Sequence, residues 1–253
     1  MLLVLFGGAL AGAVRSSLRP GVDGFGLDAW GAVLSDPDFL AAVRFSAQTA
    51  ALATIASGLL ALGAARLLRD RRATLRTLFA LPVPVPHLIA AVLALLWLAP
   101  GGLADRALDT AGLELTGDRT GAGVVLVYVW KETPFLALLV LAAWDAGVRQ
   151  REEAAAALGA GPLQRLRFVI WPAVRAPLIV GSLIVAAFVI GAFEVPLLVG
   201  PAHPPTLSTF ALDATKSPEL AGQAQASAAL LLAAAASLAL AALAARAARS
   251  PDG

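Results

Sequence analysis

Five apolar runs, each long enough to cross a lipid bilayer as a helix, restrict the fold of this chain more than any other feature. A spanning helix needs about 20 mostly apolar residues to cross roughly 30 Å of hydrocarbon. The runs are Phe39–Ala65, Leu78–Pro100, Ala122–Trp144, Pro177–Val199 and Ala221–Ala245. Because helices satisfy their own backbone hydrogen bonds inside lipid, these runs predict an all-α integral membrane protein.

A sixth apolar run, Met1–Val14, is shorter than the others. At 1.5 Å per residue it reaches only about 21 Å, so either its helix continues past Arg15 or its true start lies upstream. We expect about six transmembrane helices. Residues 1–38 would hold the short or truncated first helix and an outer loop, residues 39–249 a core of five helices, and residues 250–253 a cytoplasmic tail.

The composition supports a membrane protein and excludes several kinds of site. The chain is 59% hydrophobic and 14% charged, whereas a soluble domain carries about 25% charged residues. A net charge of +2 gives no reason to expect binding to nucleic acid. The absence of cysteine excludes disulfides, thiolate metal sites and cysteine nucleophiles. His87 and His203 lie far apart in the sequence, so we predict structural histidines, no metal site and no catalytic residue.

Arginine is distributed unevenly between the two sides of the six-helix arrangement, which predicts its orientation. One side holds Lys216 and five arginines against ten acidic residues. Cytoplasmic loops are enriched in Lys and Arg, so the other side, both chain termini included, should be cytoplasmic. Its twelve arginines are Arg66, Arg69, Arg71, Arg72, Arg76, Arg149, Arg151, Arg165, Arg167, Arg175, Arg246 and Arg249.

The outer loops contain local helix signals. Ser35-Asp36-Pro37-Asp38 predicts a helix start, because a capping side chain, a first-turn proline and acidic residues all favour the amino-terminal end of a helix. Leu103–Ala111 and Thr206–Ser217 are further candidates for short helices.

The segment from Arg151 to Val174, REEAAAALGAGPLQRLRFVIWPAV, interrupts the apolar pattern between the fourth and fifth expected spans. Strong helix formers precede Gly159, which permits a backbone turn, and Pro162 suits the first turn of a second helix. Apolar residues in that second helix recur at three- and four-residue spacing, at Leu163, Leu166 and Ile170. The segment should form a two-helix element with one apolar face. By composition alone, such a hairpin would lie on the lipid surface.

The spacing within this segment resembles the EAA loop of type I ABC importer permeases. Glu153-Ala154-Ala155 is followed by Gly159, six residues after the glutamate, and by Pro172, thirteen residues after the glycine. Trp171 departs from the pattern, since the family usually has leucine before the proline.

Three other stretches support this resemblance, which covers nearly the whole chain after about Asp38. Leu81–His87 is similar to the proline-punctuated opening of the family's membrane core. Trp130–Phe135 and Phe193–Leu197 resemble segments of the permeases that handle polyamines, ferric iron or thiamine.

The resemblance implies a membrane-spanning permease subunit in a bacterial-type cytoplasmic (inner) membrane. It further implies three partners: a cytoplasmic ABC ATPase dimer, a second permease chain that is the same or related, and an extracytoplasmic substrate-binding protein. The insert would be the coupling helix that docks into the ATPase, so its motif residues would act mechanically and the chain would not be an enzyme. These coupling residues are Glu153, Ala154, Ala155, Gly159 and Pro172.

The sequence also places ATP chemistry on another chain. It has no G-x-x-x-x-G-K-[ST] phosphate loop, and its only lysines are Lys131 and Lys216. ATP and Mg²⁺ are therefore expected on a partner ATPase, and no cofactor is expected on this chain.

Three ionisable residues, Lys131, Glu132 and Glu194, fall within the apolar runs. A charge at the bilayer centre costs about 2.5–3.5 kcal/mol on insertion scales, so each should face protein or water. Two interpretations stay open, an ion pair between helices such as Lys131 with Glu194, and a solute pathway. Two acids against one lysine, together with the acidic outer side, favour a small cationic solute, although an anionic solute stays open.

Pro134 and Pro196 each follow one of these acids by two residues. Each should kink or break its helix, as a packing feature or as a break that lines the pathway. An alternative function is an ion-coupled secondary transporter that uses Glu132 and Glu194. An intramembrane enzyme is a third option, but the sequence shows no recognisable catalytic cluster.

Overall fold

The computed structural model describes residues 2–19, 24–108, 115–217 and 220–249, and these form helices with no strand among them. The predicted tail, residues 250–253, lies outside the described residues. The helices are α1 (Leu2–Ser17), α2 (Asp28–Ser35), α3 (Pro37–Leu68), α4 (Ala73–Phe79), α5 (His87–Leu98), α6 (Leu103–Leu108), α7 (Ala122–Ala143), α8 (Ala146–Ala157), α9 (Pro162–Arg165), the π-helix η1 (Leu166–Ile170), α10 (Trp171–Gly191), α11 (Glu194–Val199), α12 (Leu207–Thr215) and α13 (Leu220–Arg249).

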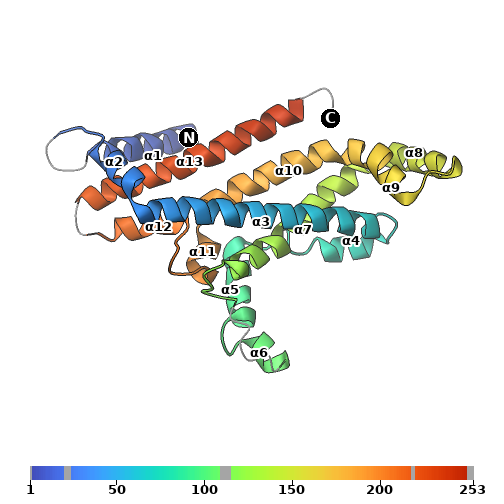
Figure 1. Ribbon diagram of the computed structural model, residues 1–253, viewed down its shortest axis with the longest axis horizontal. Helices are drawn as coiled ribbons and strands as arrows, with labels where there is room; N and C mark the ends of the chain where they lie inside the picture. The colour runs from blue at the N-terminus through green and yellow to red at the C-terminus, as the bar shows by residue number, and fades with distance from the viewer. Residues whose placement is uncertain (1, 20–23, 109–114, 218–219, 250–253) are drawn as a thin grey trace.

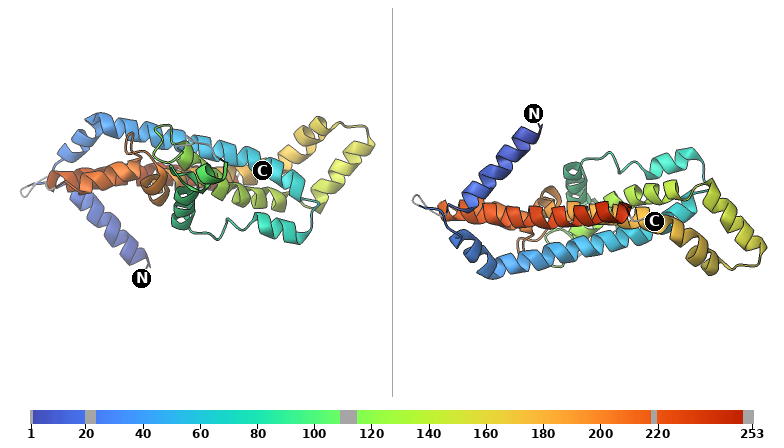
Figure 2. Two further views of the ribbon diagram at one scale, coloured as in Figure 1. Left: turned by 90° about the horizontal axis from the view of Figure 1, so that it is seen from below. Right: turned by 90° about the horizontal axis from the view of Figure 1, so that it is seen from above.

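The long helices α3, α7, α10 and α13 run roughly along the long axis of the molecule (Figure 1). α3 packs against α7 and α10, and α10 packs in turn against α13. α8 and α9 project from one end of this bundle, whereas α2 and α12 lie at the other end. α5 runs across the direction of the long helices, and Figure 2 shows α1 pointing away from the bundle although it contacts α13.

Within the residues that the structure describes, five helices are long and apolar enough to span a membrane, and each overlaps one of the five predicted spans. They cover Pro37–Leu68, His87–Ala107, Ala122–Ala143, Pro162–Gly191 and Ala221–Arg249. α1 has 16 residues, fewer than a typical span of about 20. A sixth spanning helix therefore stays a prediction.

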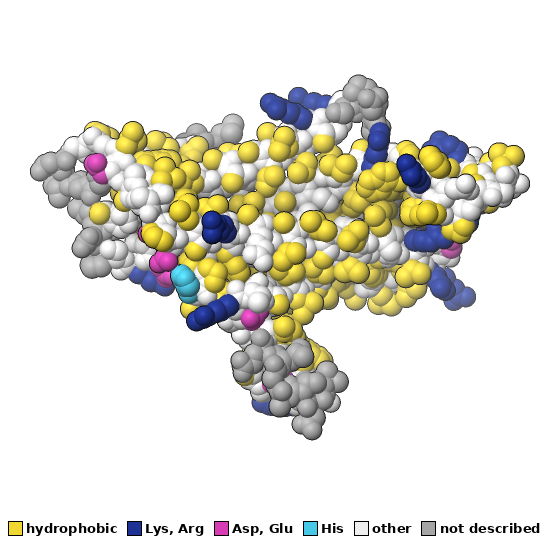
Figure 3. All heavy atoms as spheres, in the orientation of Figure 1, with side chains coloured by type: hydrophobic (Ala, Val, Ile, Leu, Met, Phe, Trp, Pro, Cys, Tyr) yellow, Lys and Arg dark blue, Asp and Glu magenta, His cyan; other side chains and the backbone are white. Residues whose placement is uncertain are grey.

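The core lies where α3, α7 and α10 pack against one another. Tyr128 and Leu136 of α7 and Val185 of α10 are almost fully buried. α3 contributes small residues, among them Ala53 and Ala61, which are completely buried and allow a close approach of helices. Large apolar side chains elsewhere face outward, and Figure 3 shows hydrophobic atoms across the middle of one face. A surface of this kind suits lipid or another membrane chain.

The predicted helix signals in the outer loops are confirmed. The Asp36 side chain accepts the backbone N–H of Asp38 at 2.8 Å, and Pro37 is the first residue of α3. The helices α6 and α12 lie within the two stretches expected to hold short helices.

The helix of the predicted span Leu78–Pro100 begins later than its apolar run, after an irregular turn. α4 ends at Phe79, a turn containing Pro82, Pro84 and Pro86 follows, and α5 starts at His87. None of the three prolines has a backbone N–H to donate to a helix, so the chain bends here instead of continuing α4.

The predicted span Pro177–Val199, the fifth of the six expected, is wrong at both ends. Its helix already begins at Trp171 as α10 and ends at Gly191, and α11 is a separate short helix. In a continuous helix the ring of Pro196 would clash with the carbonyl of Ala192, and Pro196 has no N–H to donate to that carbonyl. The chain breaks there, and the Ser208 hydroxyl donates to the Ala192 carbonyl at 2.7 Å instead. Tertiary contact with α12 thus stabilises the break.

Candidate functional site

The insert between α7 and α10 is built from two helical arms. The first arm, α8, is capped at its start by Asp145, whose side chain accepts the backbone N–H of Val148 at 2.9 Å. It therefore begins before the predicted start at Arg151. Glu153 and Ala154 are exposed on this arm, and Ala155 is partly buried. Their side chains are available to another protein at the projecting end of the molecule.

Gly159 makes the turn that ends the first arm. Its φ is +85°, in the left-handed region that side chains resist. The N–H of Gly159 donates to the carbonyl of Ala156 at 3.0 Å, and the N–H of Ala160 donates to that of Ala155 at 2.9 Å. This pair of bonds defines a Schellman motif, in which glycine is the favoured residue. The predicted function of Gly159 as a turn residue has a specific geometric basis.

The second arm continues directly into the membrane helix. It starts at Pro162, and the Gln164 side chain accepts the N–H of the capping residue Gly161 at 2.8 Å. α9, η1 and α10 then form one helical segment from Pro162 to Gly191. Pro172 follows the wider π-helical turn, which relieves the clash that a proline causes with the preceding turn. Pro172 therefore does not separate the insert from the span.

Apolar side chains surround the tip of the insert. Leu158 is 89% exposed and Leu163 is 76% exposed. A hollow of about 380 Å³ between the arms is lined by residues that include Leu158, Gly159 and Phe168. Exposed apolar residues of this kind, on an element that projects from the bundle, typically contact another protein.

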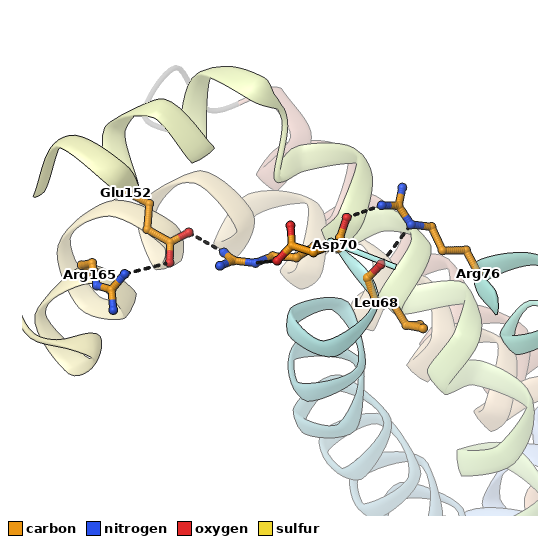
Figure 4. Close-up of polar contacts among 6 residues, drawn as sticks. Leu68, Asp70, Arg76, Glu152 and Arg165 are labelled. Atoms are coloured by element: carbon orange, nitrogen blue, oxygen red, sulfur yellow. Dashed lines mark hydrogen bonds and ion pairs between the residues drawn. The ribbon is translucent and has the colours of Figure 1, made fainter. Parts of the chain in front are cut away.

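Glu152, which the motif does not include, is the buried acid of the insert. Its carboxylate accepts a hydrogen bond from Arg69 and lies 3.6 Å from Arg165 (Figure 4). Burial lowers the pKa of the Arg69 guanidinium, but the hydrogen bonds and charges of Glu152 and Asp70 together outweigh this and raise the pKa overall. The sequence signal for the burial of Glu152 is its spacing of four residues from Val148, because residues at this spacing share one face of a helix and Val148 is also buried.

The intramembrane residues find partners other than those first expected. The Lys131 ammonium donates to the backbone carbonyl of Val83 at 2.8 Å, in the proline-rich turn before α5. The expected pair of Lys131 with Glu194 is absent from the part of the chain that the structure describes. Glu194 is exposed in the first turn of α11, where an acid is favourable.

Glu132 is buried and pairs with His87, whose Nε2 lies 3.0 Å from Glu132 Oε1. The His87 ring also stacks against Phe188 with ring centroids 4.4 Å apart. His87 thus contacts a candidate pathway residue and an aromatic ring, and its structural role stays a prediction. Of the two prolines, Pro134 lies inside α7, which continues through it, and Pro196 lies in the first turn of α11, after the break.

The end of the bundle opposite the insert carries an acidic hollow of about 320 Å³. Its lining includes Asp36, Asp38, His203 and Asp213. Within the described residues, no group of three or more His, Cys, Asp or Glu side chains is arranged to hold a metal ion.

Comparison with known proteins relates most of the chain to one family. The model of the family described as "Binding-protein-dependent transport system inner membrane component" matches residues 57–250. The thiamine transport system permease protein ThiP of Brucella abortus (strain 2308) is 29% identical over 180 residues, which cover 69% of this chain and 33% of that protein. The chain thus spans about a third of the length of this relative.

A second relative and a solved structure extend the comparison. The sn-glycerol-3-phosphate transport system permease protein UgpA of Yersinia pestis bv. Antiqua (strain Antiqua) is 35% identical over 141 residues, covering 54% of this chain and 48% of that protein. A chain of a bacterial alginate ABC transporter, solved with an alginate-bound periplasmic protein, superposes with a TM-score of 0.79 at 18% identity. The superposition covers 98% of this chain and 89% of that one, and it shows the shared fold.

Proposed function

We propose that this chain, which belongs to the family of binding-protein-dependent transport system inner membrane components, is the permease subunit of an ATP-driven importer. The observation that carries the proposal is the family match over residues 57–250, which include the whole insert and four of the five long apolar helices in full. Members of this family are translocation subunits of the inner membrane. The comparisons give no support to an ion-coupled secondary transporter.

The insert is the element through which we expect an ATPase to act. Its apolar tip, at Leu158 and Leu163, projects from the bundle and suits a groove on another protein. The coupling residues are those of the motif, Glu153, Ala154, Ala155, Gly159 and Pro172. Because the second arm and α10 form one helical segment, a displacement of the tip is carried directly into the membrane.

ATP and Mg²⁺ would be bound by the partner. The sequence has no phosphate-binding loop of the G-x-x-x-x-G-K-[ST] type, which in ATPases cradles the phosphates with backbone N–H groups. We expect two ATPase chains, one below each of two permease chains. Their closure on ATP would draw the two inserts together and open the pathway to the outside, and hydrolysis would reset it.

The arginine distribution supports an orientation with the insert and both termini in the cytoplasm. Arginine side chains gather at the end formed by α4, α8 and α9 (Figure 3), and positive charge is retained on the cytoplasmic side. The opposite end, with α2 and α12, would then receive a substrate-binding protein.

A small cationic solute is the class we favour. The acidic hollow lined by Asp36, Asp38 and Asp213 lies at the end proposed to face outward, where it would attract a cation. Within the membrane, Glu194 is the acid left exposed, whereas Glu132 is held by His87. These charges support a cation, and uptake competition between cationic and anionic solutes would test the preference.

The test of the proposed function is purification of the tagged chain from its native membrane in gentle detergent, with the co-purifying proteins identified by mass spectrometry. We expect an ABC ATPase in the eluate, and either a second related permease or a homodimer. Absence of any ATPase, even after crosslinking through residues 151–172, together with uptake that follows an ion gradient, would contradict the proposal.

A further inference from the structure

Three segments that are far apart in the sequence meet at the carboxylate of Glu152. Glu152 lies on α8, Arg165 at the end of α9, and Arg69 directly after α3 (Figure 4). The Glu152 side chain is 5% exposed, against 20% for Arg69 and 24% for Arg165. A buried carboxylate between two cations is an electrostatic link that cannot be broken without leaving charge uncompensated.

The Arg69 side of this link is held firmly. The Arg76 side chain donates to the backbone carbonyls of Leu68 and Arg69, so α4 fixes the end of α3. The Arg69 guanidinium also stacks on the ring of Trp144, 4.7 Å from its centroid. Trp144 is the joint between α7 and α8. The end of α3 is thus tied to the point where the insert leaves the membrane helix.

The Arg165 side of the link is looser. Its Nη1 lies 3.6 Å from Glu152 Oε1, close enough for an ion pair but too far for a hydrogen bond. Glu152 Oε1 and Arg165 Nε are both buried and have no hydrogen-bond partner within the described part of the chain. The two arms of the insert are therefore joined by a contact that can tighten when the insert is loaded by a partner.

We propose that Glu152 is a positioning residue that transmits movement of the insert to α3. The inference rests on the proposed function, because it assumes that the insert receives the force of an ATPase. The second arm reaches the membrane as part of α10, and the first arm reaches α7 through Trp144. Glu152 adds a third route, from α8 through Arg69 into α3, so that three membrane helices move with the insert.

The test uses Glu152→Gln and two matched variants. Asp70→Asn removes the other acid that pairs with Arg69, but Asp70 is 68% exposed and such pairs contribute little. Arg165→Gln breaks only the loose side. We expect transport per ATP hydrolysed, in the reconstituted complex, to be normal in Asp70→Asn, reduced in Arg165→Gln, and reduced about tenfold or more in Glu152→Gln, while the ATPase still co-purifies with each variant.

A distance measurement distinguishes positioning from folding. The chain has no cysteine, so spin labels can be placed at Leu67→Cys on α3 and Gln150→Cys on α8, both exposed positions. Glu152→Gln should broaden the distribution of the distance between the labels, and Asp70→Asn should leave it narrow. An unchanged distribution and normal coupling in Glu152→Gln would overturn the inference.

The two proposals fail in different ways. If the unmodified chain binds no ATPase, the proposed function fails, whereas the label distances in the full chain still report on the Glu152 link. If Glu152→Gln does not reach the membrane, Arg165→Gln is compared with Asp70→Asn. Equal coupling in those two variants would overturn the inference while the importer assignment stands.

Discussion

Replacement of Gly159 should uncouple ATP hydrolysis from transport through the backbone alone. A Cβ added at Gly159 would meet no heavy atom within 4 Å, so no neighbour is displaced. The cost comes from φ of +85°, because an L-residue in the left-handed region is less stable than glycine by about 1–2 kcal/mol. That cost lowers the population of the turn by about 5- to 30-fold relative to its alternatives.

Graded substitutions at Gly159 test this reasoning. Asparagine tolerates the left-handed region and should preserve coupling. Alanine should reduce it, and valine should reduce it most, since a β-branched residue at positive φ is a strong outlier. Gly161→Ala is the matched control in the same turn, because φ at Gly161 is −68° and the nearest atom to an added Cβ is 3.8 Å away.

The assay is uptake per ATP hydrolysed in proteoliposomes that contain the permease, its ATPase and its binding protein. Membrane abundance should be equal for all variants, because the strain lies in one turn outside the bundle. Normal uptake by Gly159→Val would refute the coupling assignment. Equal defects in Gly161→Ala and Gly159→Val would show that the turn tolerates no change, and the argument from φ would fail.

Two further predictions concern stability in detergent. Ser208→Ala should lower the free energy of unfolding by about 1–3 kcal/mol, because it leaves the Ala192 carbonyl at the helix break without its donor. Ser227→Ala is the control: its hydroxyl bonds within its own exposed turn, so its loss should change the free energy of unfolding little. Equal effects of the two variants in denaturant titrations would count against the role of Ser208. His87→Ala should lower the free energy of unfolding by a similar amount, about 1–3 kcal/mol, because it leaves the buried Glu132 carboxylate unpaired. His87→Gln keeps a donor and should recover part of that stability. A His87→Ala variant as stable as the unmodified chain would exclude the His87–Glu132 pair as a stabilising contact.

The sequence predicts the spans and the turns that depend on local chemistry. Apolar runs identify the long helices because crossing lipid requires both length and low charge. The cap at Asp36 and the turn at Gly159 follow from the conformations that these residue types favour. Each of these features is decided within a few residues of chain.

Features that depend on tertiary contact lie beyond the same reasoning. The sequence predicts a kink or break at Pro196 but not the contact that stabilises it, because the Ala192 carbonyl accepts from Ser208, which lies on a different helix. Likewise, Lys131 bonds a backbone carbonyl at Val83, which no charge pattern could indicate.

The distinction between Glu152 and Glu153 shows the same limit. The two acids are adjacent and chemically identical, yet one is buried against Arg69 and the other is exposed. The motif includes the exposed glutamate, Glu153. The glutamate that holds the insert in place becomes recognisable only when the end of α3 is brought beside α8.

The most direct test of the central claim is a crosslink from the tip of the insert. Because the chain has no cysteine, a single Leu158→Cys variant, at a position 89% exposed, can carry a short photoactivatable crosslinker in native membranes. Leu103→Cys on α6, also exposed and remote from the insert in Figure 1, is the control. The account predicts an adduct between position 158 and an ABC ATPase, and none from position 103. Absence of that adduct from position 158, or the same ATPase captured from position 103, would contradict it.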